Sequence, residues 1–106
     1  MSYKRWDVYF ALAPNFEDDK VLSRHPVMIW NDTTAFIVVF KMTSTNRGNV
    51  GMEYQLIEWE KAGLDHETSI RLIAPVKIDP KQIQEKVGTV QPVDRLKIEN
   101  KLMYGK

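Results

Sequence analysis

The segment over residues 24–45 constrains the fold of this chain more than any other. It reads RHPVMIW-NDTT-AFIVVFKMTST, with two apolar runs on either side of a polar turn. The apolar runs, residues 26–30 and 35–40, have no alternating polar positions, so they do not fit a hairpin with one face in water. We therefore predict that this hairpin forms the buried middle of a small, strongly curved β-barrel.

The same hairpin predicts where reactive side chains meet. With its turn centred on residues 32–33, the antiparallel register places Arg24 near Lys41. Guanidinium and hydroxyl groups together bind phosphate oxygens well, because both are hydrogen-bond donors and the guanidinium is charged. The open end of the hairpin is therefore the first candidate for a functional site. The other polar residues expected there are His25, Thr43, Ser44 and Thr45.

Short strand patterns and polar turns alternate along the rest of the chain. Strands are predicted at residues 4–12, 26–30, 35–40, 52–57, 68–74, 76–78 and 86–90. We expect a long polar loop at residues 13–23, a turn at 46–49, and helical turns at 58–62 and just after Asp79.

The chain ends in a predicted helix that Pro92 opens. Its apolar stripe is placed on Val93, Leu96 and Met103, and Ile98 and Leu102 would widen it. Together these elements predict a single domain over residues 1–106. The fold class is mainly β, or β-rich α+β, with about seven short strands in a curved barrel and a C-terminal helix.

Charge and composition exclude some classes of partner. A formal net charge of +1 is too small for a protein that holds duplex nucleic acid by charge alone. Short single strands remain possible, since a few cations and a stacking aromatic suffice. No apolar stretch approaches the roughly 20 residues that cross a bilayer, so no membrane partner is expected. Residues 1–12 resemble a strand rather than a secretory leader, and the absence of cysteine suits a reducing cytoplasm.

Several titratable residues are candidates for catalysis or binding. Arg71 interrupts an otherwise apolar strand, where it either pairs with an anion or simply points to solvent. His25 is the better of the two histidines as an acid–base group, because His66 lies in a polar loop. Glu17 could serve as a base if its loop folds over the rim. No cofactor or metal is expected, since cysteine is absent, the histidines lack ligand spacing, and no glycine-rich phosphate loop is present.

Several segments, in order along nearly the whole chain, resemble the PemK/MazF-type toxin family. K-R-W-D-V-Y-F-A is similar to the first strand of that family, R-H-P-V-M-I-W to its R-P-V strand, and V-F-K-M-T-S to its V-x-P-(V/I)-T-S strand. G-L-D-H-E-T-S-I-R-L, V-K-I-D and E-K-V-G-T-V-Q-P-V-D resemble its later motifs.

The resemblance implies an SH3-like barrel, a homodimer, and the toxin role in a type II toxin–antitoxin pair with a cognate antitoxin peptide as partner. The implied activity is metal-independent cleavage of single-stranded RNA by attack of the 2′-hydroxyl, which leaves 2′,3′-cyclic phosphate and 5′-hydroxyl ends. Thr43 and Ser44 match the hydroxyl pair at the scissile phosphate. Arg71 matches a strand arginine used as acid or phosphate stabiliser, and Arg24 roughly matches an arginine with an acid–base role.

The chain also departs from the family pattern. His25 stands where arginine usually precedes the proline, Lys41 and Met42 replace the residues before the hydroxyl pair, and Ile73 replaces an aspartate. The general base is therefore open, with His25 ranked ahead of Glu17. Thr45 and Lys41 are expected to help bind substrate. The alternative hypothesis is a non-catalytic SH3-like toxin or binding module, acting on a protein target such as gyrase or representing an inactive homologue.

Overall fold

The two apolar runs do form the central strands of the fold. The computed structural model describes residues 3–15, 18, 20–33, 35–44 and 52–104. In chain order its elements are β1 (Asp7–Pro14), β2 (Leu22–Asp32), β3 (Ile37–Thr43), β4 (Glu53–Gln55), β5 (Ser69–Arg71), β6 (Val76–Ile78), the 3-10 turn η1 (Pro80–Gln82), β7 (Ile83–Thr89) and α1 (Pro92–Tyr104).

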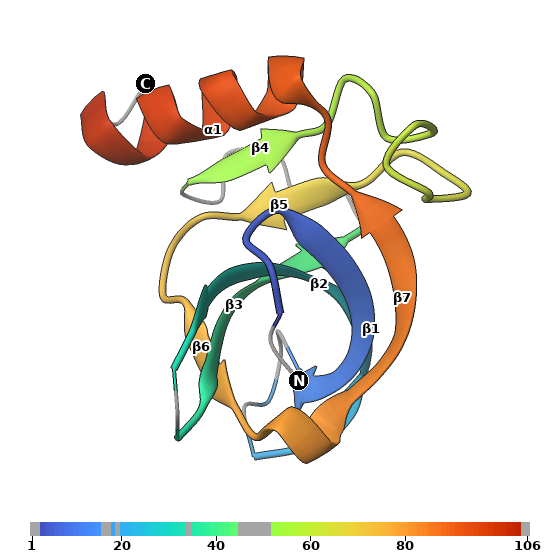
Figure 1. The fold of residues 1–106 in the computed structure, drawn as a ribbon, viewed down its shortest axis with the longest axis vertical. Coiled ribbons are helices and arrows are strands. Elements are labelled where there is room, and N and C mark those ends of the chain that lie inside the picture. Colours follow the sequence, from blue (N-terminus) through green and yellow to red (C-terminus); the bar gives the residue numbers. More distant parts are fainter. Residues whose placement is uncertain (1–2, 16–17, 19, 34, 45–51, 105–106) are drawn as a thin grey trace.

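The strands form one antiparallel sheet in the order β4-β5-β3-β2-β1-β7, and β6 pairs with β3 off this path. The first half of β3 pairs with β6 and its end pairs with β5, so β3 belongs to two differently directed parts of the sheet. Figure 1 shows β1, β2, β3, β6 and β7 curling into a ring, with β4 and β5 beside it and α1 packed beyond them. The expected mainly β fold with a C-terminal helix is confirmed, in a small β-barrel-like form.

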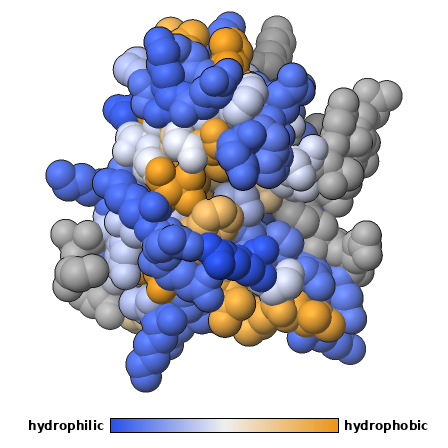
Figure 2. Space-filling view, turned by 90° about the vertical axis from the view of Figure 1, so that its right-hand side faces the viewer, coloured by the Kyte–Doolittle hydropathy of each residue, from blue (hydrophilic) through white to orange (hydrophobic). Residues whose placement is uncertain are grey.

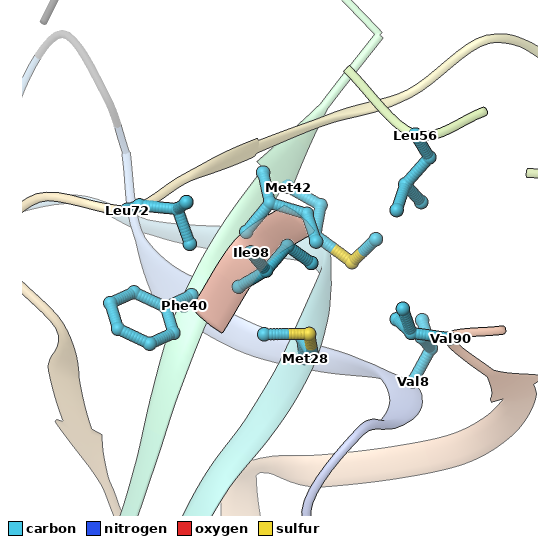
Figure 3. Packing of buried hydrophobic residues seen from close by; sticks show 9 residues of the cluster. Val8, Met28, Phe40, Met42, Leu56, Leu72, Val90 and Ile98 are labelled. Atoms are coloured by element: carbon cyan, nitrogen blue, oxygen red, sulfur yellow. The ribbon is translucent and has the colours of Figure 1, made fainter. Parts of the chain in front are cut away.

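Both faces of the central strands are buried, which explains their continuous apolar runs. On one face Met28 and Phe40 belong to a cluster that α1 covers through Ile98. On the other face Val27 and Val39 belong to a second cluster inside the ring. Figure 3 shows the side chains of the first cluster converging from β1, β2, β3, α1 and the segment after β4. Neither face of this hairpin is therefore left for water.

The hairpin register differs from the expected one. Lys41 pairs with Val27 rather than lying near Arg24, and Met28 pairs with Phe40. The predicted turn was too short, because Thr33 closes a wider loop with Phe36. The Thr33 amide donates to the Phe36 carbonyl oxygen at 3.0 Å, and the Phe36 amide donates to Thr33 Oγ1 at 3.1 Å. An irregularity between Ile29 and Asn31 shifts the register further.

The terminal helix begins at Pro92 as predicted, but it presents a different face to the body of the protein. Val93, Leu96 and Met103 are exposed, whereas Asp94 and Ile98 are fully buried. Of the predicted stripe, Ile98 and Leu102 do pack against the core, whereas Val93, Leu96 and Met103 do not. Asp94 instead turns inward, where three hydrogen-bond donors satisfy its carboxylate.

Other element boundaries moved by a few residues. The first strand begins at Asp7 rather than residue 4, since Trp6 adopts a left-handed backbone conformation with φ of 78°. Residues 58–62 form the predicted single helical turn, in which the Ala62 amide donates to the Glu58 carbonyl oxygen at 3.1 Å, and the turn ends at Gly63. The helical turn after Asp79 is confirmed, with the Asp79 side chain capping η1. The predicted turn at residues 46–49 lies outside the described residues.

β7 lies at one end of the strand order and is protected by charge. Its middle residues, Gln84, Glu85 and Lys86, are exposed. Charged side chains on an edge strand discourage pairing with a strand of another molecule. Figure 2, which looks onto the β7 side of the barrel, shows a largely hydrophilic face with hydrophobic residues in a central band and along one edge. The described part of the chain contains no helix long and apolar enough to span a membrane.

The turn that ends at Gly63 lies against the backbone of β7. A Cβ atom added to Gly88 would come within 2.1 Å of the Ala62 carbonyl oxygen, and one added to Gly63 would come within 2.2 Å of the Val87 carbonyl oxygen. Gly63 also has φ of 96°, a conformation that favours glycine. This contact anchors the connection between β4 and β5 on the barrel.

We expect Gly88→Ala to lower the free energy of unfolding by about 2 kcal/mol, because the added methyl group must push two backbone segments apart. Urea denaturation followed by tryptophan fluorescence measures this. Gln84→Ala, an exposed change in the same strand, is the control and should stay within about 0.5 kcal/mol of wild type. Equal stabilities for the two variants would contradict the close approach.

Candidate functional site

A hollow lies at the barrel rim where the predicted site residues meet. The start of β2 contributes Arg24 and His25, and the end of β3 contributes Thr43 and the following Ser44. The β4–β5 connection, residues 56–68, closes the hollow from the other side. Its polar lining is completed by Asp65 and His66, and its apolar lining comes from Phe10, Pro26, Met42 and Leu64.

The size of this hollow limits what it can hold. Its volume is about 230 Å³, whereas sites for drug-sized ligands and cofactors usually span roughly 300–1,000 Å³. A phosphodiester group with part of one nucleotide suits this space better than an organic cofactor does. Among the described residues, no group of three or more His, Cys, Asp or Glu side chains is arranged to hold a metal ion.

The hydroxyl groups at the end of β3 and the basic groups at the start of β2 lie just beyond the last pair of the β2–β3 ladder. The last β2–β3 pair is Val27 with Lys41. Beyond that pair, Arg24 and His25 of β2 line the same hollow as Thr43 and Ser44. Thus the expected meeting of cation, imidazole and hydroxyls occurs, although by a different pairing from the one predicted.

Arg24 is oriented by neighbours on both sides. Its guanidinium carbon lies 4.2 Å from the centre of the Phe10 ring, and its Nη2 forms an ion pair with Glu85 of β7. Both charged side chains are at least half exposed, so this ion pair adds little stability. The ion pair orients the guanidinium, which has five N–H donors. Glu85 accepts from Nη2.

Nε2 of His25 has two polar neighbours. Its Nε2 lies 2.9 Å from Ser23 Oγ and 3.2 Å from Asn15 Oδ1. Because the Ser23 hydroxyl donates to the same Asn15 oxygen, both neighbours are acceptors for an Nε2 proton. The neutral ring therefore carries its proton on Nε2 and its lone pair on Nδ1. Burial, and then the positive charge of Lys41, lower the pKa of His25 below its ordinary value of 6.5.

Lys41 takes a supporting position rather than a place in the lining. Its Nζ donates to the Pro14 carbonyl oxygen at 2.8 Å, which ties the end of β3 to the end of β1. The predicted proximity to Arg24 is not observed, but its charge reaches His25. Lys41 thus acts on the site electrostatically and adds to the larger effect of burial, which lowers the pKa of His25.

Arg71 lies on the neighbouring strand, outside the lining of the hollow. Ser69 of β5 pairs with Thr43, and Arg71 follows two residues later on the same face of the strand. Such diagonal neighbours are about 7–8 Å apart, within reach of a long side chain. On its other side Arg71 is paired in register with Glu53 of β4. The Arg71 side chain is half-buried, which is intermediate between the two predicted environments, a buried pair with an anion and full exposure to solvent.

His66 is the site residue that sequence reasoning set aside. The predicted polar loop agrees with a side chain that is 60% exposed, yet His66 lines the hollow. Its Nδ1 lies 2.5 Å from Asp65 Oδ1, which turns Nε2 away from the carboxylate. Only the tertiary contacts of residues 56–68 bring it to the rim. The one available signal was an aspartate directly before one of only two histidines.

Two other predicted site residues, Glu17 and Thr45, lie outside the described residues.

In comparisons with known proteins, no family model and no curated protein sequence matches this chain.

Proposed function

We propose that this protein is a metal-independent endoribonuclease that cleaves single-stranded RNA. The observation that carries the proposal is the hollow in which Arg24, His25, Thr43 and Ser44 meet. A guanidinium, an imidazole and two hydroxyls supply a proton acceptor and phosphate-binding donors within one space of phosphodiester size. Attack of the ribose 2′-hydroxyl on the adjacent phosphorus needs these two functions and no external nucleophile.

Each side chain has a role in the proposed reaction. His25 takes the 2′-hydroxyl proton on Nδ1, which its lowered pKa keeps unprotonated at neutral pH. The Thr43 and Ser44 hydroxyls and the Arg24 guanidinium donate to the non-bridging oxygens, where negative charge grows in the transition state. Arg71 adds a further cation from the strand beside Thr43. The products are a 2′,3′-cyclic phosphate and a 5′-hydroxyl end.

A single strand fits the charge of the molecule and the position of the site. The net charge is only +1, so long-range attraction for a duplex is weak. The hollow lies at a rim, where an unpaired strand can bend to present one phosphodiester. Phe10, already in contact with Arg24, offers an aromatic surface to a neighbouring base.

The biological role proposed is that of a toxin in a type II toxin–antitoxin pair, in the cytoplasm. It rests on the resemblance of the T-S strand, the R-H-P strand and the later segments to PemK/MazF-type toxins. A homodimer and a short antitoxin peptide that covers the site are the corresponding partners. The exposed Val93, Leu96, Met103 and Tyr104 on α1 provide apolar surface that such partners can bury.

A non-catalytic binding module is the second candidate, and one observation favours it. The Arg24 guanidinium is already engaged by Glu85 and Phe10, and Arg71 stands outside the hollow. Less positive charge is therefore committed to the phosphate than the family resemblance implies. On this alternative the same hollow would bind a ligand or protein segment without cleaving it.

The test is incubation of the purified protein with long single-stranded RNA in the presence of a metal chelator. We expect discrete fragments, with cyclic phosphate ends identified by their resistance to phosphatase until acid opens the ring. Thr43→Ala should reduce the cleavage rate about 100-fold, because one donor to the developing charge is lost. Lys97→Gln, an exposed change on α1, is the control. Intact RNA over varied sequences would leave the binding module as the remaining candidate.

A further inference from the structure

Both histidines of the chain line the same hollow, although they come from distant parts of the sequence. His25 enters from β2 and His66 from the β4–β5 connection. Cleavage by 2′-hydroxyl attack requires one proton to be removed and another to be supplied. Two imidazoles beside one phosphodiester-sized space could perform these two proton transfers. The proposed roles of Arg24, Thr43 and Ser44 leave the second of these requirements unassigned.

We propose that His66 is a second catalytic residue, the general acid that protonates the departing 5′ oxygen. This inference rests on the proposed RNA cleavage. The O2′–P bond forms while the P–O5′ bond breaks. The 2′-hydroxyl proton passes to Nδ1 of His25, and Nε2 of the His66 imidazolium gives its proton to O5′. One proton is taken and one is given, so the site needs no other co-reactant for this step.

The orientation of His66 suits this role. Asp65 Oδ1 accepts from Nδ1 at 2.5 Å, so Nε2 is the nitrogen that exchanges a proton with substrate. Among the residues that the structure describes, Nε2 has no hydrogen-bond partner. A carboxylate that holds one imidazole nitrogen while the other handles the proton is a general device for orienting a catalytic histidine.

The segment that carries His66 is fixed at several points, despite lacking regular structure. Thr68, which is buried, donates from Oγ1 to the His66 carbonyl oxygen at 3.0 Å, and the Thr68 carbonyl oxygen accepts from the Leu56 amide at 3.0 Å. The contact of Gly63 with Val87 anchors the same segment on β7. A catalytic group needs such support, because small displacements cost large factors in rate.

The charged groups around the two rings are of both signs. Arg24 and Asp65 share the hollow with them, Lys41 acts on His25 from β3, and Glu67 follows His66 but is hydrogen-bonded to Gln55. The cations lie on the His25 side and the carboxylate on the His66 side. The charges around His25 thus favour its neutral form, which is the form that a base needs.

The decisive experiment compares two substrates, a normal RNA dinucleotide linkage and one whose bridging 5′ oxygen is replaced by sulfur. A thiolate leaves without protonation, so a missing general acid matters little for the sulfur linkage. We expect His66→Gln to slow cleavage of the normal linkage about 100-fold and to leave the sulfur linkage within a few-fold of wild type. Asp65→Asn should give a smaller loss with the same substrate dependence.

The outcomes separate this inference from the proposed function. If wild type cleaves RNA and His66→Gln slows both linkages equally, His66 binds or positions and is not the acid. If His66→Gln cleaves both as fast as wild type, His66 has no part in the reaction. If wild type cleaves neither linkage, the proposed ribonuclease activity fails and this inference with it. Circular dichroism of each variant verifies folding. Substitution of an exposed loop residue should not change the spectrum.

Discussion

Replacing Asp94 with alanine is expected to lower the free energy of unfolding by about 4 kcal/mol. The carboxylate is fully buried and accepts from the Tyr54 hydroxyl at 2.5 Å and from the amides of Ile57 and Glu58 at 2.9 Å each. Removing the carboxylate leaves three donors without an acceptor, and each unsatisfied buried group costs roughly 1–3 kcal/mol of stability. Because the Tyr54 hydroxyl belongs to β4 and the two amides to the start of the β4–β5 connection, the loss also weakens the attachment of α1 to both segments.

Two further variants test this explanation. Asp94→Asn keeps the shape and one acceptor oxygen, so it should lose about half as much stability. Glu99→Gln, an exposed carboxylate change on the same helix, should be close to neutral. Burial, and then the hydrogen bond and negative charge of Asp94, raise the pKa of Tyr54. Ultraviolet titration of the phenol should therefore show a lower Tyr54 pKa in Asp94→Asn; an unchanged value would contradict the proposed contact.

The largest loss of activity is expected from His25. On the proposed mechanism, His25→Gln keeps a hydrogen-bonding side chain but removes the base, and should slow RNA cleavage about a thousandfold. Ser23→Ala removes only one of the partners of His25 Nε2 and should cost far less, because Asn15 remains. Single-turnover cleavage rates compare the two. If His25→Gln kept the wild-type rate, the base would have to be sought elsewhere.

The pH dependence of cleavage gives an independent check on His25. Its pKa lies below 6.5 owing to burial and then to Lys41, so the base is unprotonated at neutral pH and activity falls only as the pH drops below that value. Lys41→Met removes the positive charge, raises the pKa of His25 and should move this acid limb to higher pH. An acid limb that stays in place would contradict the electrostatic role of Lys41.

Acid also affects the fold, and the sign follows from the same shift. The folded protein disfavours protonated His25, so the unfolded chain binds more protons below pH 6.5 and stability falls as the pH drops from there towards the folded pKa. Rates in the acid limb should therefore be compared only where circular dichroism shows a folded protein.

Local sequence patterns predicted the central strands and the ends of some elements correctly. Continuous apolar runs suit strands that are buried on both faces. Met28 and Val27 are indeed buried on opposite faces of β2. Pro92 and Asp79 predicted the starts of α1 and η1, since their effects act on the adjacent backbone. These signals need no knowledge of distant residues.

The hairpin register was less predictable. Its turn depends on how the Thr33 side chain and amide bond to Phe36, and on an irregularity after Ile29. A small error in the turn moves every cross-strand pair. Thr43 and Ser44 still meet His25 and Arg24, because the predicted polar cluster spans several consecutive residues on each strand.

By itself the sequence determined a mainly β chain with a doubly buried hairpin, a terminal helix and a cluster of hydroxyl and basic residues at one rim. Only the tertiary structure decided that Asp94 faces inward and that His66 joins His25 in one hollow. Both depend on the path of residues 56–68, which is held by contacts with β7 and α1 and by the hydrogen bond between Leu56 and Thr68 at its two ends. Apolar periodicity and turn propensity act between near neighbours, whereas these contacts join residues far apart in the chain.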